Sequence, residues 1–141
     1  MTPREIRIVK QSFAAVAHQS ERLARLFYAN LFDIDPTFRL LLPGDLRRRG
    51  AKMIHALGLI VDGLDRLHVF APALEALAVR HFGYGIEEAH YRVAGEALIR
   101  TAKAALGERF TPEVEQAWRT AYAELTETMV ASARSELRLA A

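Results

Sequence analysis

Residues 72–85, PALEALAVRHFGYG, are the stretch of sequence that best indicates the fold. A proline near the start and glycines at the end are typical limits of a helix. Between them, Leu74, Leu77, Ala78 and His81 recur at intervals of three and four residues, which places them on one helical face. That face is apolar apart from His81, and the nitrogens of a buried imidazole need a partner. The partner of the His81 imidazole is therefore the first question that the sequence raises.

Helical patterning extends from this stretch in both directions, and no segment alternates with period two for long enough to predict a strand. Helices with apolar faces and short connections pack around a shared core. We therefore expect an all-α fold of about seven helices in a single domain over residues 1–141. The first helix is expected to begin after a cap at Thr2, and the second to run over Ser20–Phe32. A short third helix would hold Phe38 to Leu42, and the fourth would follow a break at Pro43–Asp45 and have an apolar face that reaches Leu64. After the helix of residues 72–85, one helix is expected over Glu87–Leu106 and a last one after a cap at Thr111.

The composition excludes several classes of function. Half of the residues are apolar (51%) and about a quarter are charged (26%), as in ordinary globular domains. No apolar run reaches the roughly 18 residues of a membrane span, and the N-terminus lacks a secretory signal, so we expect a cytoplasmic protein. The absence of cysteine excludes disulfides, thiolate metal sites and a cysteine nucleophile. The net charge of +2 is small and the arginines are spread along the chain, so no nucleic-acid partner is indicated.

Two explanations of His81 remain open on the residues alone. A lone histidine on an apolar face is commonly hydrogen-bonded within the core. The other histidines do not show the His-Glu-x-x-His spacing of a metal site. A single nitrogen ligand binds a free ion poorly, but it can bind an iron whose four in-plane ligands come from a porphyrin.

Several short stretches, taken together, resemble bacterial single-domain globins and the globin part of flavohaemoglobins. The separation of 32 between positions 49 and 81, and of 10 between positions 81 and 91, matches the spacing of those proteins. The resemblance implies a globin fold, haem b (iron protoporphyrin IX) as the cofactor, and His81 as the proximal ligand of the iron. The matching stretches are Leu26–Phe32 (LFYANLF), Asp35-Pro36, Arg80-His81, Ala89-His90-Tyr91 and Ala117–Tyr122 (AWRTAY).

The same resemblance assigns the polar residues of the distal side. Tyr28 matches a distal tyrosine whose hydroxyl would donate a hydrogen bond to bound oxygen; the alternative is a core tyrosine bonded to a backbone carbonyl. Arg49 stands at the gating position, which is usually histidine or glutamine in the family. Its guanidinium would turn out to a haem propionate or donate to a bound ligand or anion. The alternative is a solvated basic turn formed with Arg47 and Arg48.

Apolar distal residues would exclude water from the haem. Met53 resembles the bulky residue that overhangs the ligand. Leu42 stands where globins place a phenylalanine against the porphyrin, a loss of aromatic stacking for which Phe38 partly compensates. Phe27 adds to this wall. Lys52 is expected to pair with a propionate, with ligation of the iron as the minor alternative.

On the proximal side, Tyr91 matches a tyrosine that contacts the proximal histidine in flavohaemoglobins. The glutamate that works with it there corresponds to Ala133, and Glu136 is nearly one helical turn away. We therefore expect the carboxylate relay to be absent. Arg80 would pair with a propionate or simply carry a solvated charge.

These assignments lead to three hypotheses of function. The first is reversible binding of oxygen and other diatomic ligands for storage, transport or delivery, without a primarily enzymatic role. The second is nitric oxide dioxygenation, which needs a separate reductase because 141 residues hold no flavin or nicotinamide domain and no Gly-rich dinucleotide motif. The third is a sensor or haemless interaction domain, against which His81 counts. The protein is expected to be a monomer or a weak homodimer.

Overall fold

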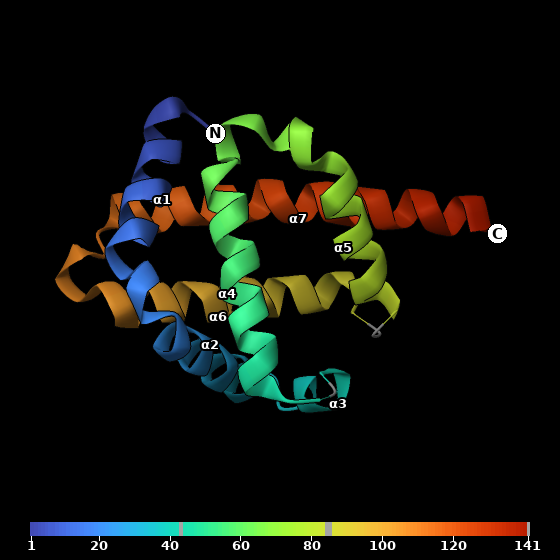
Figure 1. Ribbon diagram of the computed structural model, residues 1–141, viewed down its shortest axis with the longest axis horizontal. Coiled ribbons are helices and arrows are strands. Elements are labelled where there is room, and N and C mark those ends of the chain that lie inside the picture. Colours follow the sequence, from blue (N-terminus) through green and yellow to red (C-terminus); the bar gives the residue numbers. More distant parts are fainter. Residues whose placement is uncertain (43, 84–85, 141) are drawn as a thin grey trace.

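The computed structural model describes the backbone of residues 1–42, 44–83 and 86–140, and the side chains of these residues except 81–83, 132, 133 and 135–140. This part of the chain contains seven α-helices, three short 3₁₀ segments and no strand, which confirms the predicted all-α fold (Figure 1). None of its helices is long and apolar enough to cross a lipid bilayer. The elements are α1 (Pro3–Val16), η1 (Ala17–Gln19), α2 (Ser20–Ile34), α3 (Phe38–Leu41), α4 (Leu46–Asp62), η2 (Leu64–Phe70), α5 (Ala71–Gly83), α6 (Glu88–Leu106), η3 (Gly107–Arg109) and α7 (Pro112–Ala140).

Several helix ends lie where the sequence predicts them, because local side chains satisfy the terminal backbone groups. At the start of α1, the Glu5 N–H donates to Thr2 Oγ1 at 3.1 Å and the Thr2 N–H donates to Glu5 Oε1 at 2.9 Å. At the start of α4, Asp45 Oδ1 accepts a hydrogen bond from the Arg47 N–H at 3.0 Å. The chain leaves α6 at Gly107, whose φ of +58° favours glycine.

Five boundaries differ from the prediction. Helix α2 continues to Ile34 instead of ending at Phe32, and α6 begins at Glu88 instead of Glu87. Helix α4 ends at Asp62, so Leu64 belongs to η2 rather than to the helical face assigned to it. Gly63 follows α4 directly and packs against Phe70, where a side chain at position 63 would collide with the Phe70 ring. Leu42 lies one residue beyond α3, and α5 begins at Ala71, one residue before the predicted proline.

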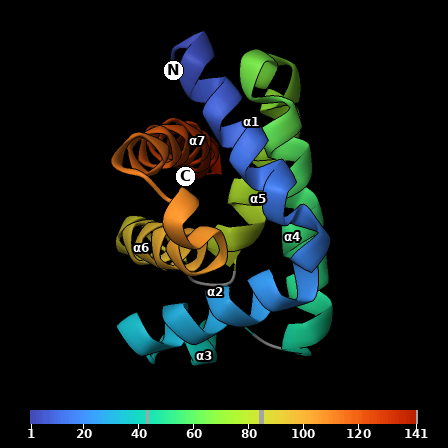
Figure 2. The same ribbon diagram turned by 90° about the vertical axis from the view of Figure 1, so that its left-hand side faces the viewer.

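The helices cross one another rather than forming a parallel bundle. In Figure 1, α4 passes in front of α6 and α7, and Figure 2 shows α4 on one side of the molecule with α6 and α7 on the other. The largest contacts join α2 to α6, α5 to α7, α2 to α4, and α1 to α7. Gly50 allows the close approach of α2 and α4, because a Cβ atom there would lie 2.8 Å from the Ala24 Cβ. Gly95 does the same between α6 and α7, facing the ring of Tyr122.

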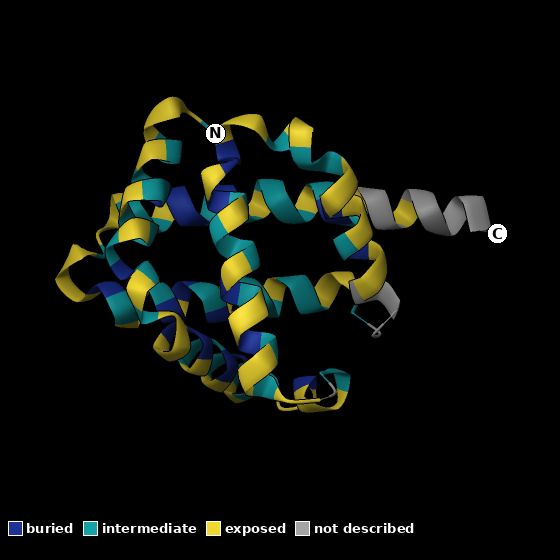
Figure 3. Cartoon of the chain, viewed as in Figure 1, coloured by how far each residue is buried: buried dark blue, intermediate teal, exposed yellow. Residues whose placement is uncertain are grey.

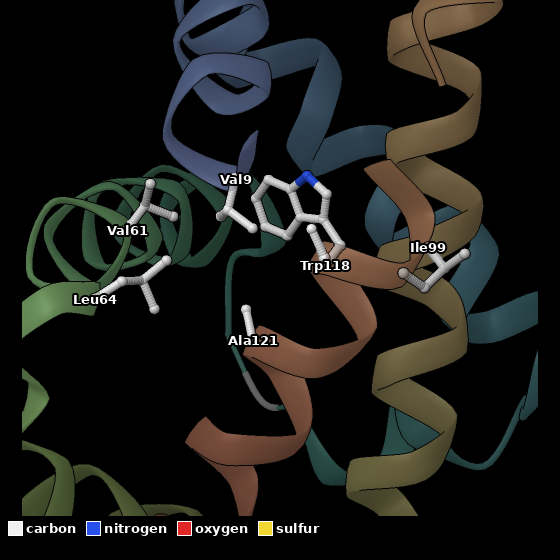
Figure 4. Close-up of a cluster of buried hydrophobic side chains, with 7 residues drawn as sticks. Val9, Val61, Leu64, Ile99, Trp118 and Ala121 are labelled. Atoms are coloured by element: carbon white, nitrogen blue, oxygen red, sulfur yellow. The ribbon is translucent and has the colours of Figure 1, made fainter. Parts of the chain in front are cut away.

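The inward faces of the helices supply the buried residues (Figure 3). One cluster joins α1, the end of α4, the start of η2, α6 and α7 around Trp118, which is 6% exposed (Figure 4). The Trp118 Nε1–H donates to Ser12 Oγ at 2.9 Å, and this hydroxyl donates to the Ile8 carbonyl at 2.7 Å. The only polar atom of the indole is thereby satisfied. The cluster consists of Val9, Val61, Leu64, Ile99, Ala117, Trp118 and Ala121.

Candidate functional site

A cavity of about 820 Å³ opens between the crossing helices, and its walls are mostly apolar. This volume lies within the range of about 300–1,000 Å³ that is typical of pockets for cofactors and small molecules. Helices α1, α2, α4, α6 and α7 supply most of the wall, and α3 and α5 complete it. The crossing of the helices therefore leaves space for a ligand much larger than a water molecule.

Every candidate site residue whose side chain the structure describes lies in the wall of this cavity. They come from five helices and from Leu42, the residue after α3, and are brought together by the fold, although the roles assigned to them stay predictions. His81 belongs to α5, but its side chain lies outside the described residues, as do the side chains of Ala133 and Glu136. The wall residues are Phe27, Tyr28, Phe38, Leu42, Arg49, Lys52, Met53, Arg80 and Tyr91.

Tyr28 is buried in the middle of α2, with an exposed fraction of 8%. Its ring stacks on Phe32 at a centroid distance of 6.0 Å and meets Phe27 edge-on at 5.7 Å. Burial raises the pKa of the Tyr28 hydroxyl, and the nearby positive charge of Arg49 offsets part of that rise. No described residue forms a hydrogen bond with this hydroxyl, including the backbone carbonyls of the alternative interpretation. The hydroxyl is thus a neutral donor in the wall of the cavity.

The three consecutive arginines at the start of α4 have different environments. Arg47 is exposed and pairs with Glu21 of α2 at 3.4 Å, and Arg48 is also exposed. Arg49 is half-buried, and its Nε atom is fully buried. Arg48 and Arg49 both line the cavity, and Arg49 is the more buried of the two, so the role assigned to Arg49 stays a prediction.

The opening of the cavity carries exposed cations. Arg48, Lys52 and Arg80 line it, and none of them has a carboxylate within ion-pair distance among the described residues. Asp45 is the single acidic residue in the described lining. An apolar interior with cations at the opening suits a flat apolar ligand that keeps carboxylates at its edge.

Apolar residues of the wall join the separate clusters of the core. Met53 packs against both the cluster around Leu23 and Ile54 and the cluster around Tyr28 and Phe38. Leu42, although outside α3, still reaches the cavity. Leu42 therefore supplies an aliphatic side chain to the wall at the place where the resemblance implies an aromatic ring in other globins.

His90 also lines the cavity, although the sequence indicated it only as part of the matching stretch Ala89-His90-Tyr91. Its Nδ1 accepts a hydrogen bond from the Glu87 N–H at 2.8 Å, at the start of α6. Its ring meets Phe38 edge-on at 5.1 Å. The spacing of three residues after the helix start was the available signal, since that position commonly returns a hydrogen bond to the cap.

Two tyrosines connect α6 and α7 on the far side of the cavity. The Tyr122 hydroxyl donates to the Tyr91 backbone carbonyl, and burial is the main cause that raises the pKa of Tyr122. Tyr91 is half-buried, and burial raises the pKa of its hydroxyl as well. Both phenols are therefore neutral at physiological pH.

The donor set gives no sign of a free-ion site: within the described side chains, no three histidine, cysteine or carboxylate residues are placed to hold a metal ion. A metal held here would need a carrier that brings most of its ligands, as a porphyrin does.

Comparison with known proteins identifies the family. The chain is 33% identical over 125 residues to a flavohemoprotein of Xylella fastidiosa and 26% identical over 138 residues to one of Bordetella parapertussis. These matches cover 86% and 96% of this chain but 31% and 34% of the relatives, so the chain spans about a third of their length. An engineered carbene transferase, made from a candidate nitric oxide dioxygenase of Rhodothermus marinus, has the same fold. It has a TM-score of 0.89 and 23% identity, with 99% of this chain and 97% of that chain covered. The family model described as Globin matches residues 25–129, and this chain therefore belongs to the globin family.

Proposed function

We propose that the cavity holds haem b, with His81 as the proximal ligand of the iron, and that the protein reversibly binds oxygen and other diatomic ligands. Membership of the globin family and the flavohemoprotein relatives imply a haem group. The observation that carries the proposal is the cavity itself. It combines about 820 Å³, apolar walls, a buried tyrosine hydroxyl and an opening lined by cations.

The residues present fit a porphyrin. Its apolar faces would lie against side chains such as Leu42 and Met53, and its two carboxylates would meet Arg48, Lys52 or Arg80 at the opening. Leu77 and Arg80 of α5 line the cavity, so the helix that carries His81 contributes to the wall. This supports His81 as the residue that supplies an axial nitrogen.

Haem iron would supply the position at which a diatomic ligand coordinates. The residues of the chain would control what happens around it. The Tyr28 hydroxyl would donate a hydrogen bond to a ligand in the cavity, and this bond is strengthened where water is excluded. Phe27, Leu42 and Met53 would keep water out and so slow oxidation of the iron.

Absorption spectra of the purified protein, mixed with haemin and recorded in the ferric, ferrous and carbon monoxide forms, test the proposal. We expect a Soret band in the native protein and its loss or shift in His81→Ala. His68→Ala, which removes an exposed imidazole from η2, is the matched control and should leave the spectra unchanged. Protein that stays colourless with haemin, or a His81→Ala variant with native spectra, would contradict the proposal.

Nitric oxide dioxygenation is the second candidate, because the relatives are flavohemoproteins. Conversion of nitric oxide to nitrate leaves the iron oxidised, so turnover requires an electron from a separate reductase. Sustained nitrate formation with a cellular reductase and NADH, at a rate well above that of the protein alone, would favour this candidate. A single turnover followed by accumulation of ferric protein would favour oxygen binding.

A further inference from the structure

The first turn of α6 is closed by a histidine that accepts a hydrogen bond. His90 Nδ1 accepts from the Glu87 N–H at 2.8 Å, and the His90 N–H donates to the Glu87 carbonyl at 3.0 Å. Because the backbone N–H always carries its proton, Nδ1 has to present a lone pair, and the imidazole has to be neutral. Histidine is the side chain that ordinarily changes its charge between about pH 5 and 8. The hydrogen bond to Glu87 is therefore possible in only one of the two protonation states of His90.

The His90 ring also supports one side of the cavity wall. It meets the ring of Phe38 edge-on at 5.1 Å, and Phe38 is only 4% exposed. Both residues line the cavity, as does Ile86, which lies just before α6. Phe38 belongs to the buried cluster that also contains Tyr28 and Leu31, and Ile86 packs against this cluster. A movement of the start of α6 would therefore disturb the wall of the cavity as well.

The charges around His90 oppose its protonation in the observed position. A positive charge in the first turn of a helix is unfavourable, and a protonated Nδ1 would point an N–H at the Glu87 N–H. Asp35, at the end of α2, offers an alternative partner. The pKa of its carboxyl is lowered, mainly because the Thr37 hydroxyl donates to it and to a smaller extent by the charge of His90. The other charged residues described at this end of the cavity are Glu87, the Glu88–Arg134 ion pair and Arg80.

We propose that His90 is a pH-sensitive cap of α6, which closes the first turn against the cavity wall when it is neutral and opens this turn when it is protonated. Only the neutral ring accepts from Glu87, so the closed form is favoured at the upper end of the range in which histidine titrates and is lost as the pH falls. Opening of the turn is a property of the chain alone. Its consequence for a bound haem rests on the proposed function, because a looser wall would release haem faster.

Hydrogen–deuterium exchange of the amides of residues 86–92, in the protein as purified, tests the opening of the turn. After correction for the intrinsic pH dependence of exchange, we expect protection in the native protein to fall by about tenfold from neutral to mildly acid pH, the size of one lost hydrogen bond. His90→Gln keeps an acceptor that commonly closes this position and does not titrate, so its protection should be independent of pH. His90→Ala has no acceptor and should be weakly protected throughout.

His68→Gln is the matched control, since it removes an exposed imidazole of η2 by the same substitution outside the cavity lining. It should lose protection in residues 86–92 at acid pH as the native protein does. Other histidines, His81 included, titrate in both the native protein and His90→Gln, so the difference between these two proteins isolates His90. An equal loss of protection at acid pH in His90→Gln and in the native protein would overturn the proposal.

Transfer of haem to an excess of a haem-binding acceptor protein tests the consequence for the cavity. We expect acidification to accelerate haem loss from the native protein by about tenfold more than from His90→Gln. The same acceleration in both proteins would overturn the connection between the cap and the cavity. A native protein that binds no haem, but whose α6 opens with pH in a manner that depends on His90, would refute the proposed function and leave the cap supported.

Discussion

Two tyrosines in the wall of the cavity have hydroxyl groups in opposite situations. The Tyr122 hydroxyl donates to the backbone carbonyl of Tyr91 and joins α7 to α6. The Tyr28 hydroxyl forms no hydrogen bond with any residue that the structure describes, although its ring packs against Phe27 and Phe32. A donor held in an apolar wall by its ring alone remains available for a ligand.

Replacement of Tyr28 by phenylalanine tests that availability. We expect Tyr28→Phe to release oxygen about tenfold faster, because it removes a donor of roughly 1.5 kcal/mol from a dry pocket. Stopped-flow displacement of oxygen by carbon monoxide measures the rate. Tyr122→Phe loses the same atom from a hydroxyl bonded within the protein, so it should lower the free energy of unfolding rather than alter release. An unchanged rate in Tyr28→Phe would reject the donor role.

At the scale of helices, α4 carries two glycines with different surroundings. Gly50 faces Ala24 of α2, where an added Cβ would lie 2.8 Å from the Ala24 Cβ, closer than side chains tolerate. Gly58 faces the ring of Phe13 at 3.6 Å, an ordinary contact distance. One glycine is thus needed for helix packing, and the other is not.

The two positions give a matched pair of substitutions. Gly50→Ala should lower the free energy of unfolding by about 1–3 kcal/mol, because α2 and α4 must move apart. Gly58→Ala should raise it by about 0.5–1 kcal/mol, since alanine favours the helix and meets no close neighbour. Urea unfolding monitored by circular dichroism measures both. A destabilising Gly58→Ala, or a neutral Gly50→Ala, would contradict this description of the interface.

Helix ends that depend on neighbouring residues in the sequence were predicted better than those that depend on contacts between helices. Ends set by local residues, such as the cap at Thr2 and the stop at Gly107, were predicted correctly. The segment Leu64–Phe70 was missed, and the packing of Phe70 against Gly63 beside it is a contact that helical periodicity does not indicate. Contacts between helices cannot be deduced from helical periodicity alone.

For the candidate site, the sequence predicted which residues lie together but not the environment of each one. Family spacing assigned nine residues that the fold gathers around one cavity, because helices of fixed register keep aligned positions together. Spacing alone left two environments for Arg49, whose Nε atom is buried in the described structure and whose role stays a prediction. His90 was overlooked as a wall residue, since its position depends on the start of α6 and on Phe38.

For the molecule as a whole, ion pairs tie distant helices together. Arg119 of α7 donates to Glu96 of α6 at 2.8 Å and to Glu115 at 2.9 Å. Arg4 of α1 pairs with Glu113 of α7 at 2.6 Å. These arginines lower the pKa values of Glu96 and Glu113 below the ordinary 4.5.

These shifts predict the direction of acid sensitivity. A carboxyl group with a lowered pKa in the folded state stabilises the fold above its ordinary pKa, and this contribution is lost as the pH falls through the lowered value. The free energy of unfolding should therefore decrease as the pH falls below about 4.5, and Arg119→Gln should reduce the slope. Urea unfolding between neutral pH and about pH 3 measures it. An identical slope in Arg119→Gln would show that the pair does not contribute.

Trp118 is the single tryptophan of the sequence, and it stands in the wall of the cavity. Haem absorbs where indole emits, so a porphyrin in the cavity would quench nearly all of the intrinsic fluorescence through energy transfer. Trp118 fluorescence therefore reports whether haem occupies the cavity: the emission should fall in proportion to added haemin until one equivalent is bound. The titration needs no added label. If the Trp118 emission stayed high beyond one equivalent of haemin, the haem would be bound outside the cavity.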